Sequence, residues 1–321
     1  SKDSSLNSDI EVRKILLNLS TEDFYKFYAD RMPYEEIPLL TSDGIVIPKI
    51  GLREALGKKD FVNQVPTIAG SNRDEVKLWL ATAEYFVELD FSALGSVLSI
   101  PNVKLKDEEA FEAFSYYRSA AWKIRGVDVP LEGLYNTGNK NIYAYRYDWD
   151  DHRRYVVADF KKLIGAAHAT EIPLLTGNSK LVGGYPLSDF IYPIGKSKIF
   201  TSRNMMRFWA NFAKNGEPGK STNNVSWHSI VNNDELGSSY MVIDNRKNLG
   251  IQSDYKTFKS LAEELYKDNR LNDLEKCVIL LQMFTFVGDD LYDKNIKHYP
   301  GRCERSESEI FLIENASYIE Y

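Results

Sequence analysis

The sequence predicts an α/β protein, in which β-strands alternate with amphipathic helices along the chain. Two short apolar runs, residues 65–70 and 141–147, have the length and composition of buried parallel strands. Helical apolar spacing follows the first run and recurs after the second, which is the alternation of an α/β fold. Because two parallel strands alone would leave long unpaired edges, we expect them to belong to a larger sheet.

Helices are predicted where apolar residues recur every three or four positions. The amphipathic stretch 200–214 contains Phe208 and Trp209 and is followed by Gly216, a typical helix stop. Other predicted helices cover residues 10–18, a short segment from Thr21, 76–87, 107–122, 255–266 and 271–291.

The remaining segments are predicted from turn residues and β-propensity. Asp43-Gly44 indicates a hairpin turn inside a strand-turn-strand at residues 37–48. A further strand is expected at residues 239–244. Three segments are expected to be irregular: the charged connection 148–164, the glycine-rich loop 178–184 and the polar last thirty residues.

The composition is that of an ordinary globular protein and argues against a polyanionic partner. The chain has 321 residues, 27% of them charged, with a net charge of −6 and a pI near 5.5. This acidic balance disfavours nucleic acid binding. No apolar run approaches the ~20 residues of a membrane span, and the most apolar segment, residues 277–287, is predicted to be a buried helix.

Neither the cysteines nor the histidines have the spacing of a metal site. The two cysteines, Cys277 and Cys303, are expected to be free thiols, with a single disulfide as the alternative. The run 148–152 contains three aspartates and a histidine. We interpret it as a solvated strand end with ion-paired Arg153 and Arg154. No metal or other cofactor is therefore expected.

His168, one of four histidines, is the candidate general base. It lies in the run 165–178 and follows Gly-Ala-Ala, so the backbone can pass close by and the ring is left accessible. An imidazole with a pKa near neutral pH is suited to take up a proton and return it. The structural alternative is an ordinary loop histidine, which is what a lone histidine usually is.

Glu75 is the candidate acid that would orient His168. It follows the strand at 65–70, and open α/β sheets place site residues just beyond the carboxyl ends of their strands. A carboxylate bonded to one ring nitrogen fixes the imidazole tautomer and stabilises the imidazolium. Glu75 could instead compensate a helix dipole or pair with Arg73, and Asp74 is the alternative acid.

Four stretches occur in the order and spacing of one enzyme family. Residues 66–75 (Pro-Thr-Ile-Ala-Gly-Ser-Asn-Arg-Asp-Glu) and 165–173 (Gly-Ala-Ala-His-Ala-Thr-Glu-Ile-Pro) carry the candidate acid and base. Residues 206–218 contain Trp-Ala-Asn-Phe-Ala-Lys-Asn-Gly-Glu-Pro, and residues 42–48 contain an Asp-Gly pair. These stretches lie within residues 30–245 and resemble those of the type B carboxylesterases, which include cholinesterases and bacterial para-nitrobenzyl esterases.

The resemblance implies an α/β-hydrolase fold, with residues 1–321 as the C-terminal part of a single carboxylesterase domain. It assigns Glu75 as the acid and His168 as the base of a carboxylic ester hydrolase that needs no cofactor. The family's Gly-x-Ser-x-Gly nucleophile elbow and glycine-rich oxyanion loop do not occur in the sequence. The serine and the oxyanion donors would come from an N-terminal part of the same enzyme, and the substrate would be a small-molecule carboxylic ester.

The same resemblance gives roles to further residues. Leu78 and Trp79 lie where family members line the substrate gorge, although burial in a helix core would explain them equally well. Glu171 is interpreted as a structural residue that holds the histidine loop, and Asn72 and Asp74 as turn-stabilising residues.

The competing function is non-catalytic. Some cholinesterase-like domains are interaction or adhesion modules that lack a complete triad. The presence of both Glu75 and His168 in matching surroundings favours the enzyme. The residue at the elbow position decides between the two functions, because acyl transfer needs a serine there.

Overall fold

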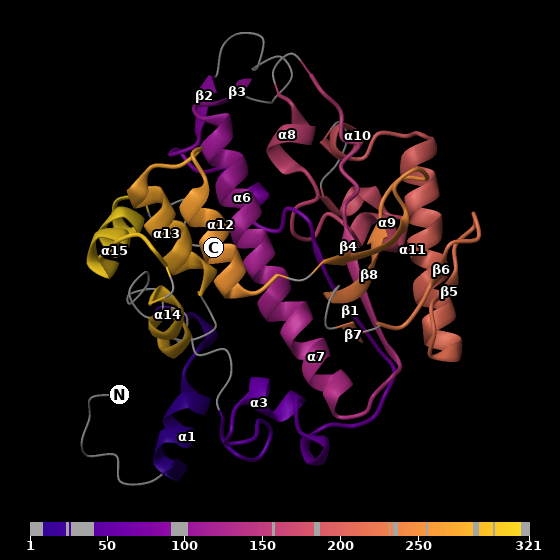
Figure 1. The fold of residues 1–321 in the computed structure, drawn as a ribbon, viewed down its shortest axis with the longest axis horizontal. Helices are drawn as coiled ribbons and strands as arrows, with labels where there is room; N and C mark the ends of the chain where they lie inside the picture. The colour runs from indigo at the N-terminus through magenta and orange to yellow at the C-terminus, as the bar shows by residue number, and fades with distance from the viewer. Residues whose placement is uncertain are drawn as a thin grey trace. The chain divides into compact units, whose positions relative to one another are not determined.

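A five-stranded sheet with three parallel strands forms the centre of the fold (Figure 1). The computed structural model describes residues 9–23, 26, 42–90, 102–155, 158–182, 187–230, 232–233, 237–254, 256–284, 289–297 and 299–315. Residues 1–52 and 53–321 form two separate units. The sheet and the candidate site both lie in the second unit.

The strand order is β1-β4-β8-β7, and β9 also pairs with β8. β1 (Thr67–Asn72), β4 (Ile142–Tyr147) and β8 (Gly237–Ile243) run parallel, whereas β7 (Asn232–Asn233) and β9 (Gly250–Asp254) are antiparallel to β8. β1 and β4 pair along their whole lengths, so their carboxyl ends meet at the same end of the sheet. The predicted α/β class is confirmed, and β8 adds a third parallel strand to the two that the sequence indicated.

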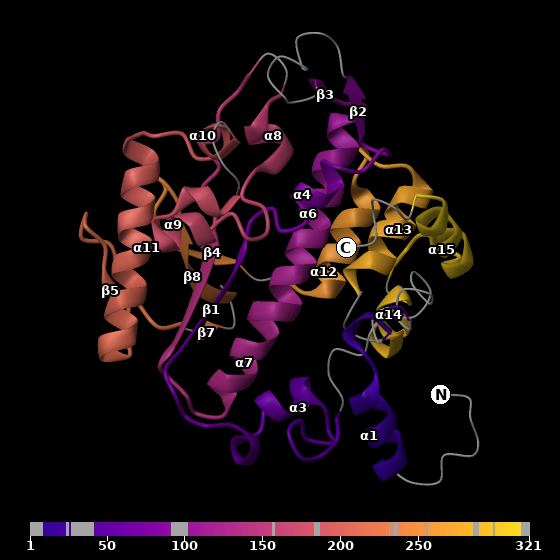
Figure 2. The ribbon, with the colours of Figure 1, turned by 180° about the vertical axis from the view of Figure 1, so that it is seen from behind.

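Helices cover both faces of the sheet (Figure 2). On one face, α6 (Glu108–Lys123) continues through a π-helical segment, η2 (Ile124–Asp128), into α7 (Val129–Asn136). On the other face, α11 (Lys196–Asn215) packs against α9 (Ile172–Thr176). The side chains of β4 alternate between these layers, as the twofold period of a strand requires.

The contacts of β4 show which side chains face which layer. Ile142 and Ala144 pack in a cluster with Val127 and Leu131, which belong to η2 and α7. The aromatic rings of Tyr143 and Tyr145 lie on the other face, where they meet the rings of Phe212 and Trp209 in edge-to-face contacts.

α6 has the cap and the apolar face that its sequence predicts. The Asp107 side chain accepts a hydrogen bond from the Ala110 backbone N–H at 2.9 Å, which caps the helix. Phe111, Phe114 and Tyr117 are buried at helical spacing. Two helices that come much later in the chain, α12 (Phe258–Lys267) and α13 (Asp273–Met283), pack against α6.

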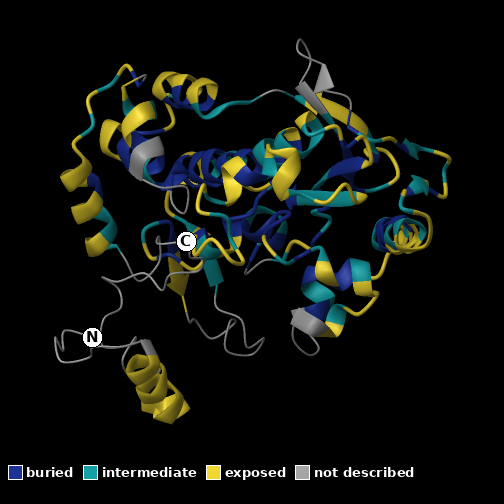
Figure 3. Ribbon diagram, turned by 90° about the horizontal axis from the view of Figure 1, so that it is seen from below, coloured by how far each residue is buried: buried dark blue, intermediate teal, exposed yellow. Residues whose placement is uncertain are grey.

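The remaining elements of the described chain are smaller. They are α1 (Asp9–Asn18) in the first unit, and α3 (Leu52–Leu56), η1 (Lys59–Phe61), α4 (Lys77–Leu80), α8 (Phe160–Ile164), η3 (Ser179–Val182), α10 (Leu187–Ile191), α14 (Asp289–Ile296), α15 (Arg305–Glu314), the pair β2 (Val87–Asp90) with β3 (Asn102–Leu105), and the pair β5 (Gly219–Lys220) with β6 (Ser226–Trp227). Within the second unit, buried residues gather around the sheet and its covering helices (Figure 3). None of the helices in the described part of the chain is both long and apolar enough to span a membrane.

The predicted helix at 76–87 is wrong in its extent, because only α4 forms there. The Thr82 hydroxyl and backbone N–H both donate to the Trp79 carbonyl oxygen, at 2.8 and 3.1 Å, which closes a turn after α4. The chain then enters β2 at Val87. Phe86 and Val87 are buried, so the apolar spacing that suggested a helix serves tertiary packing instead.

All three segments expected to be irregular contain helices. Within 178–184 the short 3₁₀ helix η3 forms, and residues 183–184 lie outside the described residues. Within 148–164, α8 forms, and Trp149 is fully buried and stacks on Tyr192 at an interplanar angle of 1°. The interpretation of 148–152 as a solvated strand end is therefore wrong. The last thirty residues include part of α14 and all of α15, and the predicted helix 271–291 is divided into α13 and α14.

The predicted strand-turn-strand at 37–48 is correct only in its turn. Residues 37–41 lie outside the described residues, and residues 42–50 form turns and bends without a strand. The Asp43 Oδ1 atom accepts hydrogen bonds from the backbone N–H groups of Ile45 and Val46, at 2.8 and 2.9 Å. A side-chain acceptor thus takes the donors that a hairpin ladder would use.

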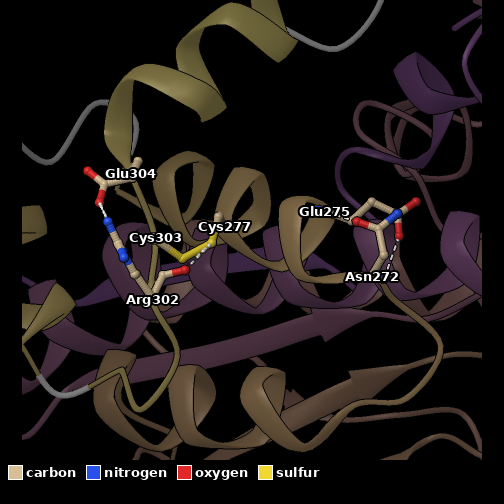
Figure 4. The surroundings of a disulfide bond; sticks show 6 residues. All are labelled: Asn272, Glu275, Cys277, Arg302, Cys303 and Glu304. Carbon is tan, nitrogen blue, oxygen red and sulfur yellow. Dashed lines mark hydrogen bonds and ion pairs between the residues drawn. A yellow bond between two sulfur atoms is a disulfide. The ribbon is translucent and has the colours of Figure 1, made fainter.

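Cys277 and Cys303 form a disulfide bond, so the expectation of two free thiols is wrong (Figure 4). Cys277 lies in α13, and Cys303 lies two residues before α15. The start of α13 is fixed by a reciprocal capping pair between Asn272 and Glu275, with hydrogen bonds of 2.8 and 2.9 Å. The disulfide therefore joins the C-terminal helix to the helical layer around α6.

Replacement of both cysteines by serine should lower the free energy of unfolding by about 3 kcal/mol, because the bond closes a loop of 26 residues. Urea denaturation followed by circular dichroism measures this difference. The wild-type chain treated with a thiol reductant is the matched control and should show the same loss. Equal unfolding midpoints for all three samples would contradict the role given to the bond.

Candidate active site

The parallel pairing of β1 and β4 brings two distant segments together at the carboxyl end of the sheet. One is the turn 73–76 after β1, and the other is the loop 165–171, which follows α8. Backbone hydrogen bonds join them directly: Asp74 N donates to Ala166 O and His168 N donates to Glu75 O, both at 3.0 Å. The topology thus places both predicted site residues where open α/β sheets carry their sites.

Glu75 and His168 are in direct contact through their side chains. Oε2 of Glu75 lies 2.8 Å from Nδ1 of His168, and Oε1 of Glu75 accepts a hydrogen bond from Asn72 N, also at 2.8 Å. The Glu75 side chain is 5% exposed, whereas that of His168 is 47% exposed. A buried carboxylate therefore holds one nitrogen of an accessible imidazole, which fixes the tautomer with the proton on Nδ1.

The hydrogen bond that His168 donates to Glu75 raises the pKa of His168 above its ordinary value. Partial burial of the ring acts in the opposite direction, and the negative charges of Glu75 and Glu171 add to the rise. The pair is therefore arranged to stabilise an imidazolium. Among the described residues, no hydrogen bond reaches Nε2 of His168, the nitrogen that is left to act on another group.

Asn72 and Glu171 hold the two ends of the histidine loop. The Asn72 side-chain amide donates to Ala167 O at 2.7 Å and to Oε2 of Glu171 at 2.6 Å. Beyond His168, Ala169 has a φ of 64°, a strained conformation for a residue other than glycine. Tyr192 helps to fix this turn, because its hydroxyl donates to the Thr170 carbonyl oxygen at 2.9 Å.

Asp74, the alternative acid, faces away from His168. Its Oδ2 atom accepts a hydrogen bond from Ala166 N at 2.9 Å and pairs with Arg73 at 2.7 Å. Burial would raise the pKa of Asp74, but Arg73 and Lys77 outweigh it, and the net effect is a pKa below the ordinary value. Asp74 thus ties the start of the histidine loop to the turn after β1.

Gly165 is required by this arrangement. Its φ of 54° lies in the left-handed region, and a Cβ atom placed on it would lie 2.4 Å from Oδ2 of Asp74. The small residue before His168 therefore allows Asp74 to approach the loop backbone.

Of the two predicted pocket residues, Trp79 contacts the imidazole. The rings of Trp79 and His168 stack with centroids 5.3 Å apart. Leu78 is 39% exposed, so burial in a helix core does not explain it. Trp122 of α6 also lies against His168, with centroids 5.5 Å apart. The sequence assigned Trp122 to a helix but carried no signal of this contact, because the contact depends on how α6 packs.

The other histidines do not join the site. His228 is exposed, and His298 lies outside the described residues. His152 is buried, which lowers its pKa, and its Nε2 atom lies 2.7 Å from the carbonyl oxygen of Gly165. His152 is thus a structural neighbour of the histidine loop that sequence reasoning missed. Within the described residues, no group of three or more His, Cys, Asp or Glu side chains could hold a metal ion.

Replacement of Glu75 by glutamine should lower the pKa of His168 towards 6.5, because the charged hydrogen-bond partner is lost. In the wild type, the contact that raises the pKa of His168 also stabilises the fold. This stabilisation is complete below the pKa of His168 in the unfolded state and is lost as the pH rises through the pKa in the folded state. NMR titration of the His168 ring protons measures the shift. Glu112→Gln is the control, because the Glu112 carboxylate pairs with Lys77 instead; an equal shift in both variants would contradict the assignment.

Replacement of Gly165 by alanine should destabilise the fold by more than the ~1 kcal/mol expected for left-handed backbone alone, since the new methyl group would overlap Asp74. Gly138→Ala is a matched control, because Gly138 has a φ of 99° but no atom within 4 Å of the position of its Cβ. Chemical denaturation compares the two variants. Equal losses would show that the contact with Asp74 is unimportant.

The sequence is similar to that of known carboxylesterases. A model of the carboxylesterase family matches residues 127–263, a segment that contains β4 and His168. Carboxylesterase 1E of Rattus norvegicus is 30% identical over 222 residues, which are 63% of this chain and 37% of that protein. Carboxylesterase 1E of Mus musculus is 28% identical over 196 residues, 55% of this chain and 33% of that protein. The chain therefore spans little more than a third of the length of these relatives.

Similar solved structures are esterases as well. The carboxylesterase EST55 of Geobacillus stearothermophilus has a TM-score of 0.44 and 19% sequence identity, and the match covers 75% of this chain and 48% of that chain. A PNB esterase has a TM-score of 0.45 and 16% identity, with 79% of this chain and 50% of that chain covered. On the evidence of the family match and the sequence relatives, the resemblance to the carboxylesterase and cholinesterase-like family that the motifs indicated is confirmed.

Proposed function

We propose that this chain supplies the acid and the base of a serine carboxylesterase that hydrolyses small-molecule carboxylic esters. The observation that carries the proposal is the 2.8 Å contact between the buried carboxylate of Glu75 and Nδ1 of the accessible His168. The family match over residues 127–263 supports this choice of chemistry.

In the proposed mechanism, Nε2 of His168 takes the proton of a serine hydroxyl while the serine oxygen attacks the ester carbonyl carbon. The resulting imidazolium is stabilised by Glu75, which remains a carboxylate. The imidazolium then gives its proton to the alkoxide leaving group as the C–O bond breaks, and an acyl-serine is left. Water, deprotonated by His168, attacks the acyl-serine and releases the carboxylic acid and the free serine.

The serine and the oxyanion donors come, in this proposal, from an N-terminal part of the same enzyme. The 321 residues contain no Gly-x-Ser-x-Gly elbow. Among the described residues, β1 pairs with β4 along one side only, and its other side carries no strand. Such an edge can accept a further strand, which would extend the sheet next to Glu75. This pairing is the contact we propose between the two parts.

Trp79 and Leu78 are proposed to line the substrate pocket. Trp79 lies directly against the general base, and the exposed Leu78 follows Lys77 on the same short helix. Both side chains are apolar and would suit the acyl or alcohol group of an uncharged ester.

Fluorophosphonate labelling of the protein purified from its natural source tests the proposal. The label should appear, on a denaturing gel, on a serine that is not among these 321 residues, either in a longer polypeptide or in a separate one. Absence of label, with the N-terminal part shown to be present by mass spectrometry, would favour the non-catalytic interaction or adhesion module. Label within the 321 residues would show that the nucleophile has been misplaced.

In unlabelled enzyme that contains the reactive serine, His168→Gln and Glu75→Gln should each lower kcat by roughly 10⁴-fold, because residues of a triad act as a unit. Hydrolysis of a para-nitrophenyl ester measures the loss. His228→Gln is the matched control, since this exposed histidine lies outside the site. Turnover that survives either substitution at the level of the control would rule out the triad assignment.

A further inference from the structure

The imidazole of His168 lies against two tryptophan side chains from different helices. Trp79 of α4 stacks on it, with ring centroids 5.3 Å apart and an interplanar angle of 27°. Trp122, in the last turn of α6, lies 5.5 Å away at 48°. The two indoles are 6.3 Å apart and nearly parallel, at 21°.

These distances show that the two indoles are neighbours and do not sandwich the imidazole. The three centroids form a nearly equilateral triangle, whereas rings stacked on opposite faces of His168 would be separated by close to the sum of the two shorter distances. We call Trp79 and Trp122 the indole wall. The wall does not enclose the imidazole, because the His168 side chain remains 47% exposed.

The indole wall is fixed by packing on the core. Both tryptophans are half-buried and pack against the main hydrophobic cluster. The turn that follows Trp79 is closed by the Thr82 hydroxyl, and the guanidinium of Arg125 lies 4.9 Å from the ring centroid of Trp122. Because both rings are restrained, the imidazole cannot turn towards them.

We propose that Trp79 and Trp122 are positioning residues that keep Nδ1 of His168 directed at Glu75 and Nε2 directed away from the wall. We further propose that the indole faces stabilise the imidazolium. The inference rests on the proposed function, in which His168 accepts a proton. The negative face of an indole attracts a cation, so the wall would favour the protonated state that proton transfer produces.

Other charged groups also affect the pKa of His168. Substitution of Trp79 or Trp122 does not remove these groups. Glu75 and Glu171 both favour the imidazolium. Arg125 packs on Trp122 and, as a cation, would disfavour it. A substitution of either tryptophan by leucine keeps these three charges and most of the apolar bulk, so it isolates the contribution of the aromatic face.

NMR titration of the whole chain tests the proposal. In Trp79→Leu and in Trp122→Leu, the pKa of His168 should fall by about 0.4 to 0.7 pH unit, the equivalent of a partly exposed cation–π contact. The corresponding phenylalanine variants should recover most of this loss, since they keep an aromatic face. Trp209→Leu is the matched control, because Trp209 is also half-buried but its rings contact Tyr145 and Trp227.

An unchanged pKa in both leucine variants, or an equal fall in the Trp209 control, would overturn the proposal. If a leucine variant does not fold, uniform incorporation of 5,6-difluorotryptophan weakens the indole quadrupole with little change of shape. A lower pKa of His168 in the fluorinated protein then supports the wall, and an unchanged pKa rejects it.

The titration requires no ester turnover, so its outcome is separate from that of the labelling experiment. A shifted pKa of His168 in the leucine variants, without a labelled serine, would support the role of the indole wall and reject the esterase. A labelled serine with an unchanged pKa of His168 would support the esterase and reject the role of the wall.

Discussion

A buried carboxylate needs hydrogen-bond donors, and the way Glu75 obtains them determines the local structure. One oxygen takes the Asn72 backbone N–H and the other takes the His168 ring. The Asn72 donor is local, three residues from Glu75, whereas the His168 donor is available only when the turn after β1 and the histidine loop lie side by side. The parallel pairing of β1 with β4 produces this arrangement, and the remaining contacts of the site keep it in place.

Side chains of the segment 72–75 hold the histidine loop at several positions. Asn72 binds Ala167 and Glu171, Asp74 binds Ala166, and Glu75 binds His168. Each of these side chains contacts a different position of the loop. The loop is therefore fixed along its length, and the strain at Ala169 can be sustained next to His168.

The sequence predicted those features that depend on local signals. The apolar runs of β1 and β4 and the helical spacing of α6 and α11 are signals of this kind, and the small residues around His168 distinguish it from the other histidines. Features that depend on packing were missed. Trp122 approaches His168 only because of how α6 packs. The helix predicted at 76–87 ends early, at Leu80, before the turn at Thr82. The pairing of Cys277 with Cys303 requires α13 and α15 to be in contact.

Glu75 and His168 are separated by 93 residues in the chain, so their contact closes a long loop. Loop closure of this length is entropically costly, and non-local contacts of this kind form late in folding. Glu75 can therefore raise the pKa of His168 only after β1, β4 and the intervening helices have come together. The protonation equilibrium of a single histidine is thus a measure of whether β1 and β4 have assembled correctly, and it can be followed in any variant without an enzymatic assay.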